Sequence, residues 1–153
     1  VRKRMFETRQ GNIFDAQVEA IVNPVNCVGV MGKGLALQFK KRYPDNFEAY
    51  KRACKAEQVR PGEMFIFTRE DKPTHIINFP TKRHWRSKSR FEDVESGLFA
   101  LVKEVRRLGI RSIAIPPLGC GLGGLDWAVV GPMIEASFVS LDDVDVYLYA
   151  PKV

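Results

Sequence analysis

Two glycine-rich segments of this sequence have the composition of loops that bind phosphate groups. They cover residues 23–34 and 116–124, and each contains at least three glycines. Glycine lets a backbone turn tightly and bring its N–H groups close to an anion. Lys33 is followed by Gly34, so the first segment is not a Walker P-loop, and Pro117 delays the helix that a dinucleotide-binding loop requires. Either segment alone can be a purely structural connection, but together they predict a cradle for a pyrophosphate.

A third segment, residues 79–90, combines cations with an aromatic side chain. Five lysines and arginines lie within the nine residues from Lys82 to Arg90, with Trp85 among them. A solvated charged loop is the simpler interpretation of such a run. The same pattern also suits a nucleic acid, whose phosphates pair with cations and whose bases stack on aromatic rings. Both interpretations stay open at this point.

Lys82 differs from the other cations of this segment because it directly follows a predicted strand. At a strand end, its side chain can reach a ligand pocket. We expect the neighbouring Arg83 to lower the pKa of Lys82 and so to favour the neutral amine. A neutral lysine amine can attack an electrophile or transfer a proton. Lys82 is therefore the candidate catalytic residue.

The remaining reactive side chains do not form a recognisable site. Three cysteines and two histidines are present, without the spacing of a metal site or a disulfide framework. We therefore expect neither a metal nor a cofactor. Cys27 and Cys120 lie in the two glycine-rich segments and are candidates to line a pocket. Neither has a base nearby in the sequence that would make it a nucleophile.

Length and composition predict one domain. The 153 residues are 45% hydrophobic and 27% charged, as in soluble globular proteins, so we assign residues 1–153 to a single domain and expect a monomer. No apolar run approaches the roughly 20 residues that cross a bilayer, and no signal peptide is seen. We therefore expect a cytoplasmic protein with no membrane partner. The net charge of +6 favours a polyanionic partner.

Hydrophobic periodicity predicts the elements that must position these segments. Strands are expected at residues 5–9, 20–23 (ended by Pro24), 63–68, 75–79, 112–115 and 145–149. One helix is expected at residues 35–43, and a second is expected to follow Asp45 as its N-cap. A third is expected from the capping box at 89–92 to residue 108, and a fourth from Gly131 with Pro132 at its first position. Strands alternating with helices predict an α/β fold, a three-layer α/β/α sandwich around a central mixed sheet. Ligands of such sheets bind beyond the carboxyl ends of the strands.

Several of these segments resemble the macrodomain, an ADP-ribose-binding α/β/α module. Residues 11–13, Gly-Asn-Ile, resemble an element near its first strand. Residues 20–26, Ala-Ile-Val-Asn-Pro-Val-Asn, resemble its second strand and the start of its ribose loop, and residues 116–124 resemble its phosphate loop. The resemblance covers nearly the whole chain and implies the macrodomain fold.

Within that family, the sequence is most similar to the DarG type, which is related to terminal ADP-ribose protein glycohydrolase. The similarity lies in residues 31–36, 39–41, 79–90 and 119–122, together with Trp127. It implies a hydrolase that cleaves an N-glycosidic bond and removes ADP-ribose from thymidine bases in DNA, as an antitoxin against a DarT-type toxin. Such a toxin is expected to be engaged through a region that this chain lacks. A non-catalytic ADP-ribose reader and a protein ADP-ribosyl glycohydrolase are the alternatives.

The resemblance also implies roles for individual residues, with Lys82 at the catalytic lysine position. ADP-ribose would be bound by Asn12, Ile13, Asn26, Gly32, Lys33, Gly34, Gly119, Cys120, Gly121, Leu122 and Gly123. The DNA strand would be contacted by Arg83, His84, Trp85, Arg86 and Lys88.

Two positions depart from the family pattern. Asn12 stands where many macrodomains have an aspartate that accepts a hydrogen bond from adenine, and its amide oxygen can still accept one. Gly123 stands where the human protein glycohydrolase has a catalytic aspartate, so the sequence does not support a lysine–aspartate pair. The sequence also does not separate attack by Lys82 on the anomeric carbon from proton transfer to the leaving base.

Overall fold

The computed structural model describes residues 4–152, which form six strands, four α-helices and one short 3₁₀ helix. The strands are β1 (Phe6–Arg9), β2 (Ala20–Val25), β3 (Phe65–Thr68), β4 (His75–Pro80), β5 (Ser112–Ile115) and β6 (Asp145–Tyr149). The helices are the 3₁₀ helix η1 (Ile13–Asp15), α1 (Gly34–Arg42), α2 (Pro44–Lys55), α3 (Phe91–Leu108) and α4 (Trp127–Ser137).

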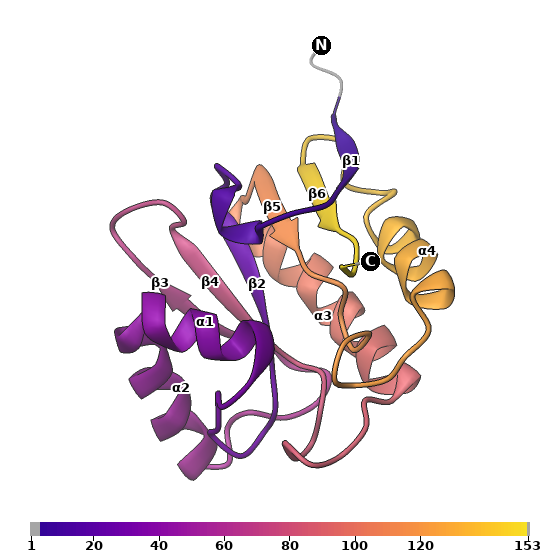
Figure 1. The fold of residues 1–153 in the computed structure, drawn as a ribbon. Coiled ribbons are helices and arrows are strands. Elements are labelled where there is room, and N and C mark those ends of the chain that lie inside the picture. Colours follow the sequence, from indigo (N-terminus) through magenta and orange to yellow (C-terminus); the bar gives the residue numbers. More distant parts are fainter. Residues whose placement is uncertain (1–3, 153) are drawn as a thin grey trace.

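The strands form one mixed sheet in the order β1-β6-β5-β2-β4-β3. All neighbouring pairs are parallel except β3–β4, which is an antiparallel hairpin at the sheet edge. Figure 1 shows α1 and α2 on one face of the sheet, with α3 and α4 on the other. The expected α/β/α sandwich with a mixed sheet is confirmed.

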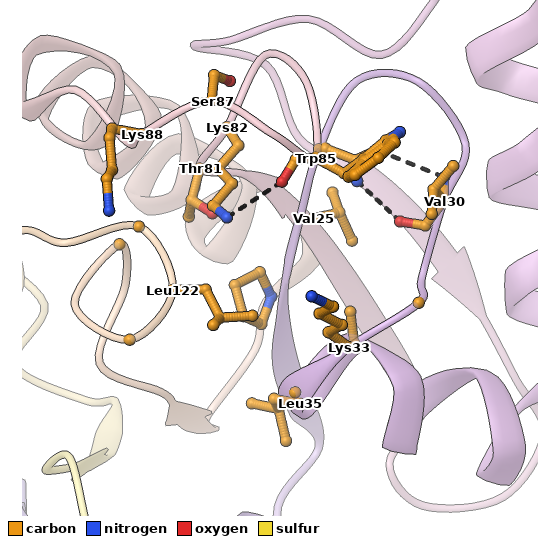
Figure 2. A pocket seen from close by; sticks show the side chains of 18 of the residues that line it. Val25, Val30, Lys33, Leu35, Thr81, Lys82, Trp85, Ser87, Lys88 and Leu122 are labelled. Carbon is orange, nitrogen blue, oxygen red and sulfur yellow. Dashed lines mark hydrogen bonds between the residues drawn. The ribbon is translucent and has the colours of Figure 1, made fainter.

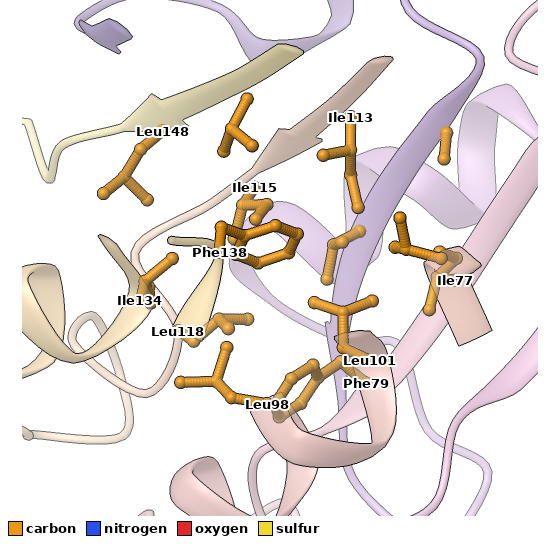
Figure 3. Close-up of a cluster of buried hydrophobic side chains, with 14 of the residues drawn as sticks. Ile77, Phe79, Leu98, Leu101, Ile113, Ile115, Leu118, Ile134, Phe138 and Leu148 are labelled. Atoms are coloured by element: carbon orange, nitrogen blue, oxygen red, sulfur yellow. The ribbon is translucent and has the colours of Figure 1, made fainter. Parts of the chain in front are cut away.

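Strand residues alternate between the two faces, as a sheet covered on both sides requires. Ala20 and Val22 of β2 pack in the cluster that includes α3 and α4, whereas Ile21 between them packs with Phe39 of α1. Figure 3 shows the larger cluster, in which side chains of the sheet meet those of α3 and α4. The two cores fix the sheet, so the strand ends have little freedom to move.

Several element boundaries differ from the sequence-based expectation by one or more residues, and three of them have a clear local cause. β2 continues through Pro24 to Val25, because beyond Ile21 it pairs with β4 but no longer with β5, and a missing N–H is tolerated there. α2 begins at Pro44, which leaves Asp45 in its first turn instead of at the cap. α4 begins at Trp127 instead of Gly131, because the Asp126 side chain accepts a hydrogen bond from the Ala128 N–H, and Pro132 lies inside the helix.

The start of α3 also differs. Its N-cap residue is Arg90, without a side-chain capping bond, so the expected capping box is wrong. The Ser89 hydroxyl is buried and has no hydrogen-bond partner among the described residues. The end of the helix is as expected, since Gly109 adopts the left-handed conformation with a φ of 64°.

A buried network of asparagines ties α2 to the centre of the sheet. Asn78 of β4 exchanges two hydrogen bonds with Asn46 of α2, at 2.9 and 3.2 Å. Its side-chain oxygen also accepts a bond from Asn23 of β2, and its nitrogen donates to the Phe65 carbonyl. All three asparagines are fully buried. The network therefore holds β2 and α2 in a fixed relation beside the first glycine-rich loop.

Asn78→Ala removes the centre of this network, and we expect it to lower the free energy of unfolding by at least about 2 kcal/mol, because several buried polar groups lose their partners. Asn46→Ala is the matched control: it removes one arm and leaves the Asn23 and Phe65 contacts in place, so its cost is smaller. Urea unfolding of both variants measures the difference. Equal losses would contradict a central role for Asn78.

Candidate active site

A cavity of about 750 Å³ lies where β2, β4 and β5 end. The carboxyl ends of these parallel strands meet at one edge of the sheet, so the loops that follow them converge. All three segments singled out in the sequence contribute to its wall (Figure 2): the first glycine-rich loop (residues 26–36), the cationic segment (81–88) and the second glycine-rich loop (116–123).

The cavity wall carries positive charge and no negative charge. Lys33, Lys82, Arg86 and Lys88 line it. None of the described residues that form its wall is an aspartate, glutamate, histidine or cysteine. An anion is therefore the ligand that this cavity favours.

Lys82 lies in this wall as expected, and its Nζ is 3.4 Å from the Trp85 carbonyl oxygen, to which it donates a hydrogen bond. Burial lowers the pKa of Lys82, and the charges of Lys88 and Lys33 lower it further. The direction agrees with the sequence-based expectation, but the source does not, because Arg83 is not among the causes. The charges that lower it come from Lys88 of the same cationic segment and from Lys33 of the first glycine-rich loop.

Arg83 instead forms a two-point ion pair with Asp93 of α3, with both N–O distances at 3.1 Å. The Asp93 side chain is buried, whereas that of Arg83 is half exposed. The pair anchors the cationic segment to the helix and turns Arg83 away from the cavity, whose wall it does not join. Arg83 thus anchors the cationic segment to α3, and the expected DNA contact by its half-exposed side chain stays a prediction.

The first glycine-rich loop is organised around Asn26. Its side-chain oxygen accepts hydrogen bonds from the Val28 and Val30 N–H groups and from the Tyr50 hydroxyl, at 3.0, 3.4 and 2.7 Å. Its side-chain nitrogen donates to the Val30 carbonyl at 2.8 Å. Asn26 lines the cavity, as expected, but its amide oxygen is used to fold the loop. Sequence reasoning did not identify Tyr50, whose hydroxyl also donates to the Asn26 carbonyl at 2.8 Å.

Gly32, Lys33 and Gly34 follow in the same loop and line the cavity. Gly34 begins α1 with a φ of 59°, a conformation that suits glycine. Leu35, the next residue, also lines the cavity and packs against the cluster that contains Ile13. Its position directly after Gly34 is the feature of the sequence that could have identified Leu35 as a residue of the cavity wall.

The second glycine-rich loop is closed by backbone bonds. The Leu125 N–H donates to the Gly119 carbonyl at 2.8 Å, and the Ser89 N–H donates to the Gly123 carbonyl at 3.0 Å. A Cβ on Gly123 would overlap the Ser89 hydroxyl and lie 2.5 Å from the Gly119 carbonyl oxygen. This explains the departure at position 123, because no side chain fits there while Ser89 occupies that space.

Some expected binding residues lie away from the cavity wall. Cys120 does not line the wall, and its thiol donates to the Leu118 carbonyl at 3.5 Å. Burial, with a smaller contribution from Asp126, raises the pKa of Cys120 to about 11, so the thiol stays protonated. Gly121, Leu122 and Gly123 of the same loop do line the cavity.

Asn12 and Ile13 are also absent from the wall. The Asn12 side-chain oxygen caps η1 by accepting a bond from the Phe14 N–H at 3.0 Å, and Ile13 is buried beneath the sheet edge with Ala114 and Tyr149. Leu35, which lines the cavity, packs against the cluster that contains Ile13. A role at the adenine end of a ligand stays a prediction for both residues.

The exposed part of the cationic segment forms one rim of the cavity. Trp85 is 44% exposed, and its ring is stacked by the Arg86 guanidinium at 4.5 Å and lies 5.2 Å from the His84 ring. Lys88 lies deeper. A Cβ on Gly124 would be 3.6 Å from its Nζ, so Lys88 sits against the second glycine-rich loop.

The sequence matches the model of the Macro domain over residues 22–134, which is most of the chain. The chain belongs to the macrodomain family. A curated relative from Mycobacterium tuberculosis, DNA ADP-ribosyl glycohydrolase, is 52% identical over 144 residues; the match covers 93% of this chain and 41% of the relative. This macrodomain therefore spans about two fifths of the length of that protein.

Solved structures agree. The macrodomain of Mycobacterium tuberculosis DarG superposes with a TM-score of 0.95 and 50% identity, covering 97% of this chain and 99% of that one. DarTG of Thermosipho africanus in complex with ADP-ribose superposes with a TM-score of 0.90 and 35% identity, covering 98% of this chain and 43% of that one. The DarG type of macrodomain that the motifs predicted is confirmed.

No helix within residues 4–152 combines the length and apolar character needed to cross a membrane. No group of three or more histidine, cysteine, aspartate or glutamate side chains in the same range is arranged to hold a metal ion.

Gly123→Ala places a methyl group against Ser89 and the Gly119 carbonyl, and we expect a loss of about 1–3 kcal/mol in the free energy of unfolding from overpacking. Gly121→Ala is the matched control, because a Cβ there meets nothing within 4 Å. Chemical denaturation of both variants distinguishes them. A Gly123 variant as stable as the Gly121 variant would show that the loop has room for a side chain.

Proposed function

We propose that this macrodomain removes ADP-ribose from thymidine bases in DNA and so reverses a DarT-type toxin. The observation that carries the proposal is the position of Lys82, in the wall of one acid-free cavity together with both glycine-rich loops. Relatives named as DNA ADP-ribosyl glycohydrolases and a related DarTG structure with ADP-ribose support the choice of substrate. The cavity volume of about 750 Å³ suits a ligand of this size.

In the proposed complex, the diphosphate lies on the second glycine-rich loop, where Gly121 exposes its backbone, Gly123 lines the cavity and Lys88 supplies a cation. The distal ribose lies between the Gly32–Gly34 stretch and Lys82. The adenine extends along Leu35 toward Ile13 and Asn12. His84, Trp85 and Arg86 stay outside the ADP-ribose and face the DNA strand.

Lys82 then acts on the bond between the distal ribose and thymine. Its neutral amine either attacks the anomeric carbon, or accepts a proton from the water that attacks there. In both cases the C–N bond breaks with its electron pair on thymine, which takes up a proton, and water completes the hydrolysis. The lowered pKa of Lys82 favours the neutral amine that both routes need.

The direct test is a single-stranded oligonucleotide carrying ADP-ribosyl-thymidine. We expect the wild-type protein to release ADP-ribose and unmodified DNA, and Lys82→Ala to lose at least about a hundredfold in rate while binding free ADP-ribose nearly as tightly. Chromatography follows release, and calorimetry follows binding. Turnover by the alanine variant at the wild-type rate would refute the catalytic assignment. Tight binding by the wild-type protein without release would favour a non-catalytic reader.

The pH dependence tests the charge state of Lys82. Because the neutral amine is required, we expect the rate to rise with pH and level off as Lys82 loses its proton. Lys88→Met removes one cation that lowers the pKa of Lys82, so the pKa rises and the rising limb moves to higher pH, while Lys88→Arg leaves it nearly in place. A rate that falls with rising pH would instead identify Lys82 as an acid.

A further inference from the structure

An exposed apolar strip leads from the cavity mouth across the tip of the first glycine-rich loop. Val28, Val30 and Trp85 are 43%, 38% and 44% exposed, although all three are hydrophobic. Val30 and Trp85 both line the cavity, and Figure 2 shows them on the same side of it. Exposed apolar side chains at the rim of a binding site indicate a partner that covers them.

The same loop packs against α2, and two lysines of that helix, Lys51 and Lys55, lie on the side of the helix that the loop contacts. A Cβ on Gly29 would lie 3.5 Å from the Cys54 Cβ and 3.7 Å from the Lys51 Cγ, so the loop tip rests on this face of the helix. Lys55 is four residues after Lys51 and therefore shares its face, about 6 Å further along the axis. Both lysines are exposed, and neither forms an ion pair within residues 4–152. Apolar surface and free cations are thus adjacent.

We propose that the DNA strand next to the modified thymidine leaves the cavity over the tip of the first glycine-rich loop and reaches α2. Its bases lie against Trp85 and the two valines, and its phosphates pair with Lys51 and Lys55. This path rests on the proposed function and extends it to the flanking nucleotides. The strand must be single, because only unpaired bases can turn their faces to apolar side chains while phosphates contact cations.

The test is a fluorescence anisotropy titration of an unmodified single-stranded 12-nucleotide DNA over a range of salt concentrations. Lys51→Ala combined with Lys55→Ala is expected to weaken binding at least tenfold at low salt and to reduce the log–log salt slope by roughly 1.4, which is twice the value of about 0.7 per phosphate contact in single strands. Lys103→Ala combined with Lys152→Ala removes the same charge from exposed positions elsewhere and is expected to keep the wild-type slope. Thermal unfolding checks that all variants are folded.

Several results would overturn the proposal. These are an unchanged slope in the α2 variant, an equal loss in the control variant, equal losses for single-stranded and duplex DNA, and no binding of the single strand by wild-type protein. Release of ADP-ribose from a modified thymidine mononucleotide is a separate measurement, and we expect the α2 variant to keep it within about twofold, because the two sites are independent. Absence of release by the wild-type protein would refute the proposed function, whereas the binding data would still decide the path of the strand.

Discussion

The accumulation of like charge in one cavity is the constraint on which the site depends. Lys33, Lys82, Arg86 and Lys88 line it without a carboxylate, and burial together with the charges of Lys88 and Lys33 lowers the pKa of Lys82. The repulsion between these like charges becomes smaller when Lys82 loses its proton and when an anionic ligand binds. A diphosphate bound between Lys88 and the second glycine-rich loop would be such an anion, and Lys82 is the group that loses its proton. The charges of the wall therefore favour an anionic ligand, whereas the uncharged amine of Lys82 is favoured first by burial and then by the charges of Lys88 and Lys33.

Such a cavity persists because the loops that form it are fixed by contacts made outside it. Tyr50 and the Asn26 side chain fold the first glycine-rich loop from within. The Arg83–Asp93 pair holds the cationic segment on α3, and Ser89 fills the space behind Gly123. These contacts are directional or sterically demanding, and they come from helices packed on both faces of the sheet. The site is thus positioned before any ligand arrives, which lowers the entropy cost of binding.

Sequence reasoning identified the fold and the three segments of the site because both depend on local patterns. Alternation and glycine content are readable residue by residue, and Lys82 was found from its place after a strand. The side-chain contacts that these residues make could not be predicted from the sequence. Arg83 is adjacent to Lys82 in sequence but pairs with Asp93, and the Lys88 side chain lies against the second glycine-rich loop. Such pairings are set by where α3 and the loops meet, and no local pattern contains that information.

The absence of acidic groups from the cavity wall also has a chemical consequence, given the proposed substrate. A glycosidic bond to an amine or an alcohol needs a strong acid to protonate the leaving group, but thymine leaves through a nitrogen flanked by two carbonyls, which delocalise its negative charge. Its departure needs little proton donation. Gly123 therefore costs the reaction little by lacking a carboxylate, and the space it leaves is used by Ser89 to hold the second glycine-rich loop. A lysine poised as a neutral amine is then sufficient for the chemistry, because the leaving group supplies the part that an acid supplies elsewhere.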